Sequence, residues 1–353
     1  MRTEALSILR DGTVIPATPL ALTAGKKLDE KRQRLLTRYY LNAGAGGIAA
    51  GVHTTQFEIH DEKIGLLPPV LEIVADEAAR YEKSSGKTII KIAGACVPIS
   101  QAVKEAELAR ELGYDAVLLS PGGLESFTED YFLARARAAA EVMPVIGFAL
   151  QAAVGGPVFT YDYWAALCEI DNVVAIKAAP FDRYQTLNIV RAAALSQRAD
   201  GISLYTGNDD NIVVDLLTRF SFRKEGKVIE KTFAGGLLGY YAVWTKKAVE
   251  LFNMLREARE CGVVNADLLT LAAKITDMNA AVFDPAHGFT GCISGVHEVL
   301  RRQGLLAGTW CISGRERLSP GQAGEIDRVY EMYPELTDDE FIRANSEKWS
   351  EGL

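Results

Sequence analysis

The chain has 353 residues, of which 48% are hydrophobic and 24% are charged, and its formal net charge is −8. This composition is typical of a globular protein with enough apolar side chains for a large core. An acidic chain without a basic cluster lacks the charge pattern of proteins that bind nucleic acids or anionic membranes. We therefore expect neither partner.

Targeting segments and cysteine chemistry are also constrained by the sequence. Residues 1–17 hold no continuous apolar stretch, so we expect no signal peptide. No run of about eighteen apolar residues occurs, so we expect no membrane-spanning helix. The five cysteines are odd in number and lack Cys-x-x-Cys spacing, unlike a disulfide framework or a zinc site. We expect a cytoplasmic protein with free thiols and no bound metal.

Short apolar segments alternate with longer amphipathic ones over the first 240 residues. Most of the short segments are rich in Val, Ile, Leu and Ala without strict alternation, which is typical of parallel strands covered on both faces. The predicted strands are 13–22, 47–52, 88–96, 116–121, 144–150, 173–179, 201–207 and 232–239. The predicted helices between them are 29–44, 69–84, 99–113, 129–142, 161–170, 183–197 and 210–220.

Eight strands that alternate with helices predict an α/β protein with a (β/α)8 TIM barrel. A doubly wound open sheet is the alternative, but it favours a glycine-rich phosphate turn after the first strand, and PATPLAL is not one. After the strands, helices are predicted at 244–262, 265–283, 295–306 and 319–333. We therefore predict a barrel over residues 1–240 and a C-terminal helical region, an extension of the barrel, over 241–353.

Lys177 is the one cation in the apolar segment NVVAIKAAP, residues 172–180. It falls toward the C-terminal end of the sixth predicted strand, the end at which TIM barrels carry their active sites. Burial lowers the pKa of a lysine, and a neutral amine can form a Schiff base with a carbonyl compound. A lysine that reaches a polar neighbour is the simpler alternative. Lys91 lies near the start of its strand and is a weaker candidate.

The segment GVHTTQFEIHDEK, residues 51–63, directly follows the second predicted strand. The adjacent hydroxyls of Thr54 and Thr55, with backbone N–H groups at a turn, can hold a carboxylate. His53 can act as an acid or base near neutral pH. The alternatives are an ordinary threonine-based turn and a histidine that only forms hydrogen bonds.

Six segments occur in a particular order along the chain. They are VIPATPLAL near the N-terminus, Thr54–Thr55 after strand two, SPGG after strand four, PVIGFAL as strand five, NVVAIKAAP as strand six and YTGNDD after strand seven. In this order and spacing, residues 12 to 240 resemble the dihydrodipicolinate synthase and N-acetylneuraminate lyase family of class I aldolases.

The resemblance implies a (β/α)8 barrel with a helical C-terminal extension, assembled as a homodimer or homotetramer. It implies that Lys177 condenses with pyruvate or another 2-oxo acid, and that Thr54 and Thr55 bind the carboxylate of this acid. The covalent imine on the lysine is the reactive group, so no cofactor is implied.

The chain departs from this family where a tyrosine is expected. The family places a catalytic tyrosine at the end of strand five, and this position falls here on Phe148 or Ala149. The synthase members of the family also carry a tyrosine pair after strand four, where this chain has Gly122 and Gly123. We therefore expect that the chain is not a true dihydrodipicolinate synthase. His53, beside the carboxylate site, is the provisional replacement for the tyrosine.

Other polar groups are expected on the same rim of the barrel. Gln151, after strand five, can orient a substrate but cannot transfer protons. Asp209, after strand seven, either caps a helix or meets the distal part of the substrate. Tyr161 and Tyr163 are expected to pack in a helix.

The stretch 283–304 contains two histidines and two arginines. His287, His297 and Asp284 show no HxH or HxxxH spacing, which argues against a metal site. Arg301 and Arg302 are expected to form salt bridges at a subunit contact.

The sequence thus predicts a lyase, an aldolase or a hydratase/dehydratase, that forms an imine between Lys177 and a 2-oxo acid. Two alternatives stay open. One is a non-catalytic homologue that binds a 2-oxo acid or sugar acid, and the other is a divalent-metal-dependent barrel aldolase.

Overall fold

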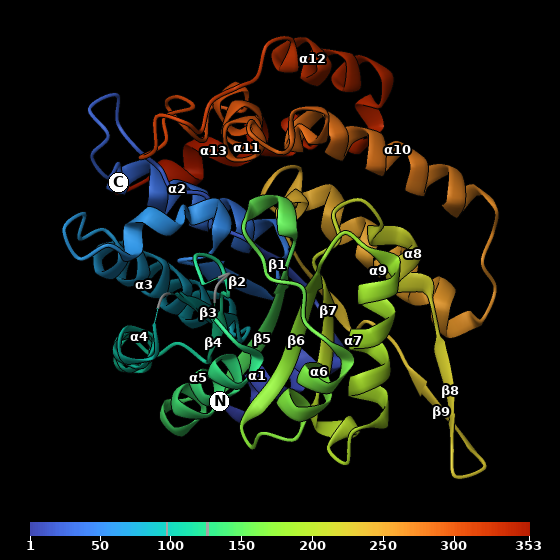
Figure 1. Ribbon diagram of the computed structural model, residues 1–353. Helices are drawn as coiled ribbons and strands as arrows, with labels where there is room; N and C mark the ends of the chain where they lie inside the picture. Colours follow the sequence, from blue (N-terminus) through green and yellow to red (C-terminus); the bar gives the residue numbers. More distant parts are fainter. Residues whose placement is uncertain (97, 125–126) are drawn as a thin grey trace.

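The computed structural model describes residues 1–96, 98–124 and 127–353 (Figure 1). In these residues a sheet of eight parallel strands runs in the order β1-β10-β7-β6-β5-β4-β3-β2. A parallel bridge between Ala17 and Ala49 joins the two end strands and closes the sheet into a barrel. The strands are β1 (Val14–Pro16), β2 (Gly47–Ala50), β3 (Ile90–Ala95), β4 (Ala116–Leu119), β5 (Val145–Leu150), β6 (Val173–Ala179), β7 (Ser203–Thr206) and β10 (Gly235–Leu238).

Helices surround this barrel and connect its strands (Figure 1). Several begin where a side chain accepts a hydrogen bond from the first turn, as Asp29, Thr128, Thr160 and Asp182 do. These helices are α2 (Glu30–Ala43), α3 (Leu67–Ser85), α4 (Ile99–Glu111), α5 (Glu129–Val142), α6 (Tyr161–Cys168), α7 (Arg183–Leu195), α8 (Ile212–Leu217) and α9 (Thr245–Cys261). The prediction of a (β/α)8 barrel is confirmed.

The strands have apolar side chains on both faces, and these form two separate clusters. One cluster fills the space between the strands and the outer helices. The other fills the inside of the barrel and includes Ile15, Ile92 and Ala175. Helix α1 (Thr3–Asp11) closes the lower end of the barrel in Figure 1, because its buried Ala5 and Leu9 belong to the interior cluster.

The remaining helices lie at the opposite end of the barrel (Figure 1). They are α10 (Asp267–Phe283), α11 (Cys292–Arg302), α12 (Gln322–Met332) and α13 (Asp339–Ser350). The chain after residue 240 is therefore helical, as predicted, and the division at residue 240 stays a prediction. Across the described parts of the chain, no helix is long and apolar enough to cross a membrane.

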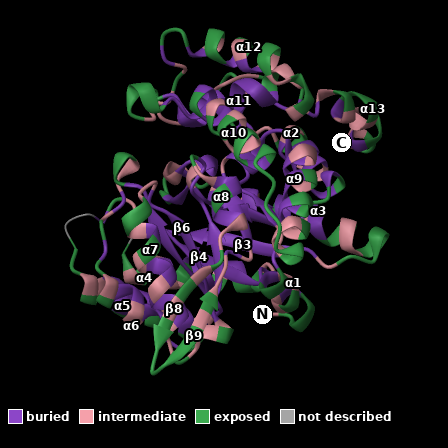
Figure 2. Cartoon of the chain, turned by 90° about the vertical axis from the view of Figure 1, so that its right-hand side faces the viewer, coloured by how far each residue is buried: buried purple, intermediate pink, exposed green. Residues whose placement is uncertain are grey.

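One element between α8 and β10 was not predicted. Strands β8 (Phe220–Lys224) and β9 (Lys227–Lys231) form an antiparallel hairpin that projects from the barrel, and Figure 2 shows its exposed surface. Its turn residues Glu225 and Gly226 both have positive φ, as a two-residue hairpin turn requires. The predicted helix 210–220 is accordingly shorter, because the chain enters β8 at Phe220.

Strand β3 packs tightly against the loop that follows β2. A Cβ atom on Gly94 would overlap the carbonyl oxygen of Gly51. A Cβ atom on Gly201 would meet open space, and neither of the two glycines has a positive φ. Gly94→Ala should therefore lower the free energy of unfolding by about 1–3 kcal/mol through overpacking. Gly201→Ala is the matched control for thermal or denaturant unfolding. Equal stability of the two variants would contradict this account.

Candidate active site

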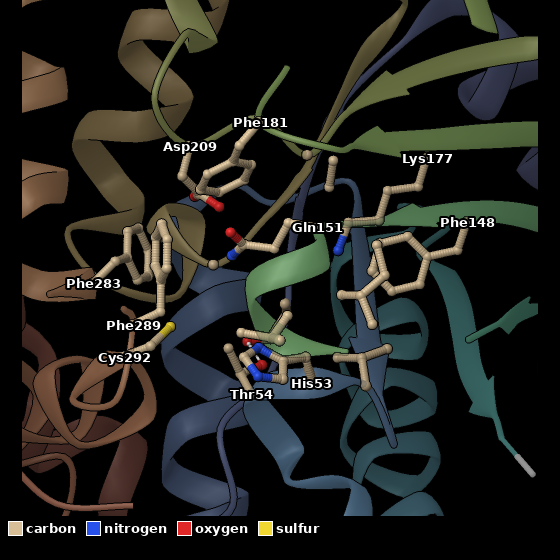
Figure 3. A pocket seen from close by; sticks show the side chains of 17 residues that line it. His53, Thr54, Phe148, Gln151, Lys177, Phe181, Asp209, Phe283, Phe289 and Cys292 are labelled. Atoms are coloured by element: carbon tan, nitrogen blue, oxygen red, sulfur yellow. Dashed lines mark hydrogen bonds between the residues drawn. The ribbon is translucent and has the colours of Figure 1, made fainter. Parts of the chain in front are cut away.

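A cavity opens at the C-terminal ends of the barrel strands (Figure 3). Its volume is about 50 Å³. All the predicted site residues except Thr55 line it: Lys177, His53, Thr54, Gln151 and Asp209. The other described lining residues are Ala17, Val52, Phe148, Leu150, Val154, Ala179, Phe181, Gly207, Gly239, Phe283, Phe289 and Cys292.

Lys177 lies on the interior face of β6, where the alternation of the strand also turns Ala175 and Ala179 inward. Its side chain is buried. Burial lowers the pKa of this amine, and the negative charge of Asp209 opposes the shift. Asp209 is the polar neighbour whose charge acts on this amine, as the simpler alternative expects.

Phe148 is the neighbour of Lys177 across β5 and β6. The two residues are paired in the strand register, and the Lys177 Nζ atom lies 4.3 Å from the centre of the Phe148 ring. Phe148 belongs to the interior cluster, whereas Ala149 belongs to the outer one. Of the two positions considered for the family tyrosine, only Phe148 therefore faces the lysine, and its ring carries no hydroxyl.

The threonine pair forms a short 3-10 turn, η1 (His53–Thr55). The Thr54 hydroxyl donates a hydrogen bond to the carbonyl of Ala17 (2.7 Å), and the Thr55 hydroxyl donates to that of Thr18 (2.7 Å). Both hydroxyl hydrogens are thus engaged by the loop after β1. The first N–H groups of such a turn have no partner within it, so a carboxylate would be held by backbone donors.

His53 lies at the start of this turn, against the cavity. Burial, together with the charge of Lys177, lowers the pKa of the imidazole to about 4. The ring is therefore neutral at pH 7, and it is a weaker base than an exposed histidine.

Asp209 lies in the loop between β7 and α8. The backbone N–H of Tyr240 donates to its Oδ1 atom (2.8 Å), and the Asn279 amide donates to its backbone carbonyl. Burial raises the pKa of this carboxyl, while Tyr240 and Lys177 oppose the shift. Helix α8 begins after Asn211, so the interpretation of Asp209 as a helix cap is wrong. The side chain instead faces the cavity (Figure 3).

The wall opposite Lys177 was not anticipated from the sequence. Phe181, Phe283, Phe289 and Cys292 gather there, and the last three come from α10, the following loop and α11 (Figure 3). Phe181 and Phe289 both have positive φ, which is uncommon for non-glycine residues and cannot be read from a sequence. The C-terminal helices therefore complete the cavity that the barrel begins.

Other residues discussed from the sequence lie elsewhere. Tyr163 stacks on Phe159 with ring centres 3.9 Å apart, which confirms its packing role. Both arginines, Arg301 and Arg302, pair with Glu298 of their own helix. Their place at a subunit contact stays a prediction.

The two histidines of the stretch 283–304, His287 and His297, have different neighbours. His287 contacts Asp284 at 2.6 Å, and His297 lies 3.9 Å from the sulfur of Cys311. Within the described ranges, no group of three or more His, Cys, Asp or Glu side chains is placed to hold a metal ion.

No protein-family model and no curated protein matches the sequence. Solved structures do match over most of the chain. Dihydrodipicolinate synthase from Oceanobacillus iheyensis superimposes with a TM-score of 0.73 at 17% identity, covering 94% of this chain and 99% of that one. The chain has the fold of these enzymes.

Two further structures extend the likeness. N-acetylneuraminate lyase from Fusobacterium nucleatum gives a TM-score of 0.68 at 17% identity, covering 92% of this chain and 99% of that one. The synthase from Acinetobacter baumannii, solved in complex with pyruvate, gives 0.71 at 18% identity, covering 91% and 98%. The fold shared by the synthases and the lyases is therefore the fold of this chain.

The charge of Asp209 can be tested through its effect on Lys177. Asp209→Asn removes a negative charge that favours the ammonium form, so the pKa of Lys177 should fall further. The pH dependence of Lys177 acetylation by acetic anhydride, read by peptide mass spectrometry, should shift to lower pH. Cys292→Ser on the same wall is the control. A shift to higher pH, or none, would contradict the electrostatic coupling.

Proposed function

We propose that the protein is a lyase that forms a Schiff base between Lys177 and pyruvate or another 2-oxo acid. The observation that carries this proposal is the burial of a lone amine on the interior face of β6, with a lowered pKa, inside a cavity at the catalytic end of the barrel. The fold shared with N-acetylneuraminate lyase and with a dihydrodipicolinate synthase solved in complex with pyruvate supports it.

The reaction begins when the neutral amine of Lys177 attacks the ketone carbon of the acid. Water leaves and an iminium forms, which draws electrons from the neighbouring carbon. The carbon next to the iminium carbon then loses a proton, or its bond to the following carbon of the substrate breaks. In either case the electron pair left behind is held as an enamine. Addition of water to the restored imine releases the product and returns the amine.

The surrounding groups have separate tasks in this proposal. The turn His53–Thr55 presents the backbone N–H groups of its first residues to the carboxylate, because the N–H of Thr55 already donates to the Val52 carbonyl. Gln151 orients the bound acid. His53, which is neutral, accepts the proton from the carbon next to the iminium. Asp209 meets the distal part of the substrate. No cofactor is needed, because the iminium itself withdraws the electrons.

We also propose that the chain is not a true dihydrodipicolinate synthase, because the ring beside Lys177 is Phe148. A cytoplasmic homodimer or homotetramer is the proposed assembly. A non-catalytic binding protein for a 2-oxo acid is the second candidate, and the missing hydroxyl beside the lysine favours it.

Reductive trapping tests the role of the lysine directly. Borohydride reduction in the presence of pyruvate should add the mass of the reduced acid to the peptide that contains Lys177, and Lys177→Met should abolish this adduct. Lys91→Met is the matched control, because Lys91 is also a buried strand lysine but lies at the opposite end of its strand. Lys177 left unmodified in a folded protein would overturn the proposal.

Proton exchange on bound pyruvate tests the role of His53 and distinguishes a lyase from a non-catalytic binding protein. His53→Gln should leave the trapped adduct intact but slow solvent exchange of the pyruvate methyl protons by roughly 100-fold or more, as the loss of a general base does. The exchange is followed by NMR in deuterated water. Unchanged exchange would remove His53 from the mechanism. Trapping without any exchange in the wild-type chain would favour the non-catalytic candidate.

A further inference from the structure

One buried carboxylate, that of Asp215, ties together the loops that follow strands β6 and β7. Asp215 lies on helix α8, is 1% exposed, and is not among the described residues that line the cavity. Its Oδ2 atom accepts hydrogen bonds from Thr206 (2.6 Å) and Asn208 (2.9 Å). Its Oδ1 atom accepts from Asn211 (3.0 Å) and Arg183 (2.5 Å). A carboxylate has about four acceptor positions, so these donors occupy it fully.

Asn208 extends this network to the wall of the cavity. Its Nδ2 atom donates to Asp215, and its backbone N–H donates to the hydroxyl of Thr206 (3.2 Å). Its Oδ1 atom accepts from the backbone N–H of Phe181 (3.0 Å) in the loop after β6. Asn208 is therefore held at three of its atoms. It fixes Phe181 and its own neighbour in the chain, Asp209, both of which line the cavity (Figure 3).

The loop that contains Asn208 packs directly against Lys177. A Cβ atom on Gly207 would come within 2.7 Å of the Lys177 Cε atom. Asp209, two residues further on, acts on the same lysine through its charge, and the neutral His53 is the other titratable group whose pKa responds to this lysine. The Coulomb energy falls as the distance between two charges grows. The position of this loop therefore sets how strongly Asp209 favours the ammonium form.

Asp209 depends on this support because its own surroundings disfavour a charge. Burial raises the pKa of this carboxyl, and the N–H of Tyr240 and the charge of Lys177 oppose the shift, while the charge of Asp210 adds to it. A charged carboxylate gains hydration when it moves from a buried position toward water. If the loop loosens, we therefore expect Asp209 to move away from the buried amine.

We propose that Asp215 is a positioning residue for the reaction at Lys177. It acts through Asn208, which holds Gly207 and Asp209 against the lysine. This inference rests on the proposed function and adds to it a residue outside the cavity lining. A carboxylate that only stabilised α8, or whose own charge acted on the lysine, would not need Asp209 for its effect. That difference can be measured.

A double-mutant cycle with the full-length chain tests this route. Asp215→Asn replaces one carboxylate oxygen by an amide nitrogen that faces hydrogen-bond donors, so the loop should loosen. The midpoint pH for acetylation of Lys177 by acetic anhydride should then fall by about 0.4 unit or more, the lower end of the couplings within one hydrogen-bond network. In the Asp209→Asn background, Asp215→Asn should leave the midpoint as it is, because the charge through which it acts is gone. The pH profile of pyruvate trapping is recorded in parallel.

Two further comparisons control for the loss of a charge and for a loss of folding. Glu77→Gln removes another buried helix carboxylate that pairs with arginines, Arg34 and Arg38, and it should not move the midpoint. Where Asp215→Asn does not fold, Thr206→Val removes one donor to Asp215 with little change in shape and should lower the midpoint. Thr206→Ser keeps the hydroxyl and should return the midpoint toward the wild-type value.

The outcomes distinguish this inference from the proposed function. Absence of a pyruvate adduct on Lys177 in the wild-type chain overturns the proposed function, even where the acetylation midpoints behave as expected. A trapped adduct together with an unchanged or raised midpoint in folded Asp215→Asn overturns the inference alone. An equal fall of the midpoint in the Asp209→Asn background also overturns it, because Asp215 would then act on the lysine without Asp209.

Discussion

The structure depends on one energetic constraint, the burial of an amine in an apolar barrel wall. An ammonium group is costly in such surroundings, so the fold shifts the balance of Lys177 toward the neutral amine. The Phe148 ring covers one side of the amine, and α1 closes the far end of the barrel. Asp209 opposes the lowering of the Lys177 pKa, because its negative charge favours the ammonium form. These opposed effects hold the pKa of the amine below that of an exposed lysine.

The barrel and the C-terminal helices contribute different parts of the site. The barrel supplies Lys177 on strand β6 and the turn η1 in the loop after β2. A hydrogen bond from the Thr54 hydroxyl to the Ala17 carbonyl holds this turn. The C-terminal region supplies Phe283, Phe289 and Cys292, which line the cavity opposite Lys177. The hydroxyls of Thr54 and Thr55 donate to the loop after β1 and so fix the shape of the turn.

Much of this arrangement follows from local sequence patterns. The apolar strand segments and the helix caps predict the barrel, and one lysine in an apolar strand predicts the centre of the site. The choice between Phe148 and Ala149 required the strand register, because a shift of one residue reverses the face. Phe289 could not be predicted, since its place in the cavity depends on a contact with Phe181 more than a hundred residues away and on a positive φ. The β8–β9 hairpin was missed because its exposed strands carry little apolar pattern.

A crystal structure of the chain after reduction with pyruvate tests the central claim most directly. The account predicts continuous electron density from the Lys177 Nζ atom to the second carbon of the acid. It also predicts the carboxylate against the backbone N–H groups of the turn at His53–Thr55, and the methyl carbon directed toward Phe181 and Phe289. A free Lys177, or an adduct whose carboxylate lies against Phe181 and Phe289 instead of at the turn, would contradict it.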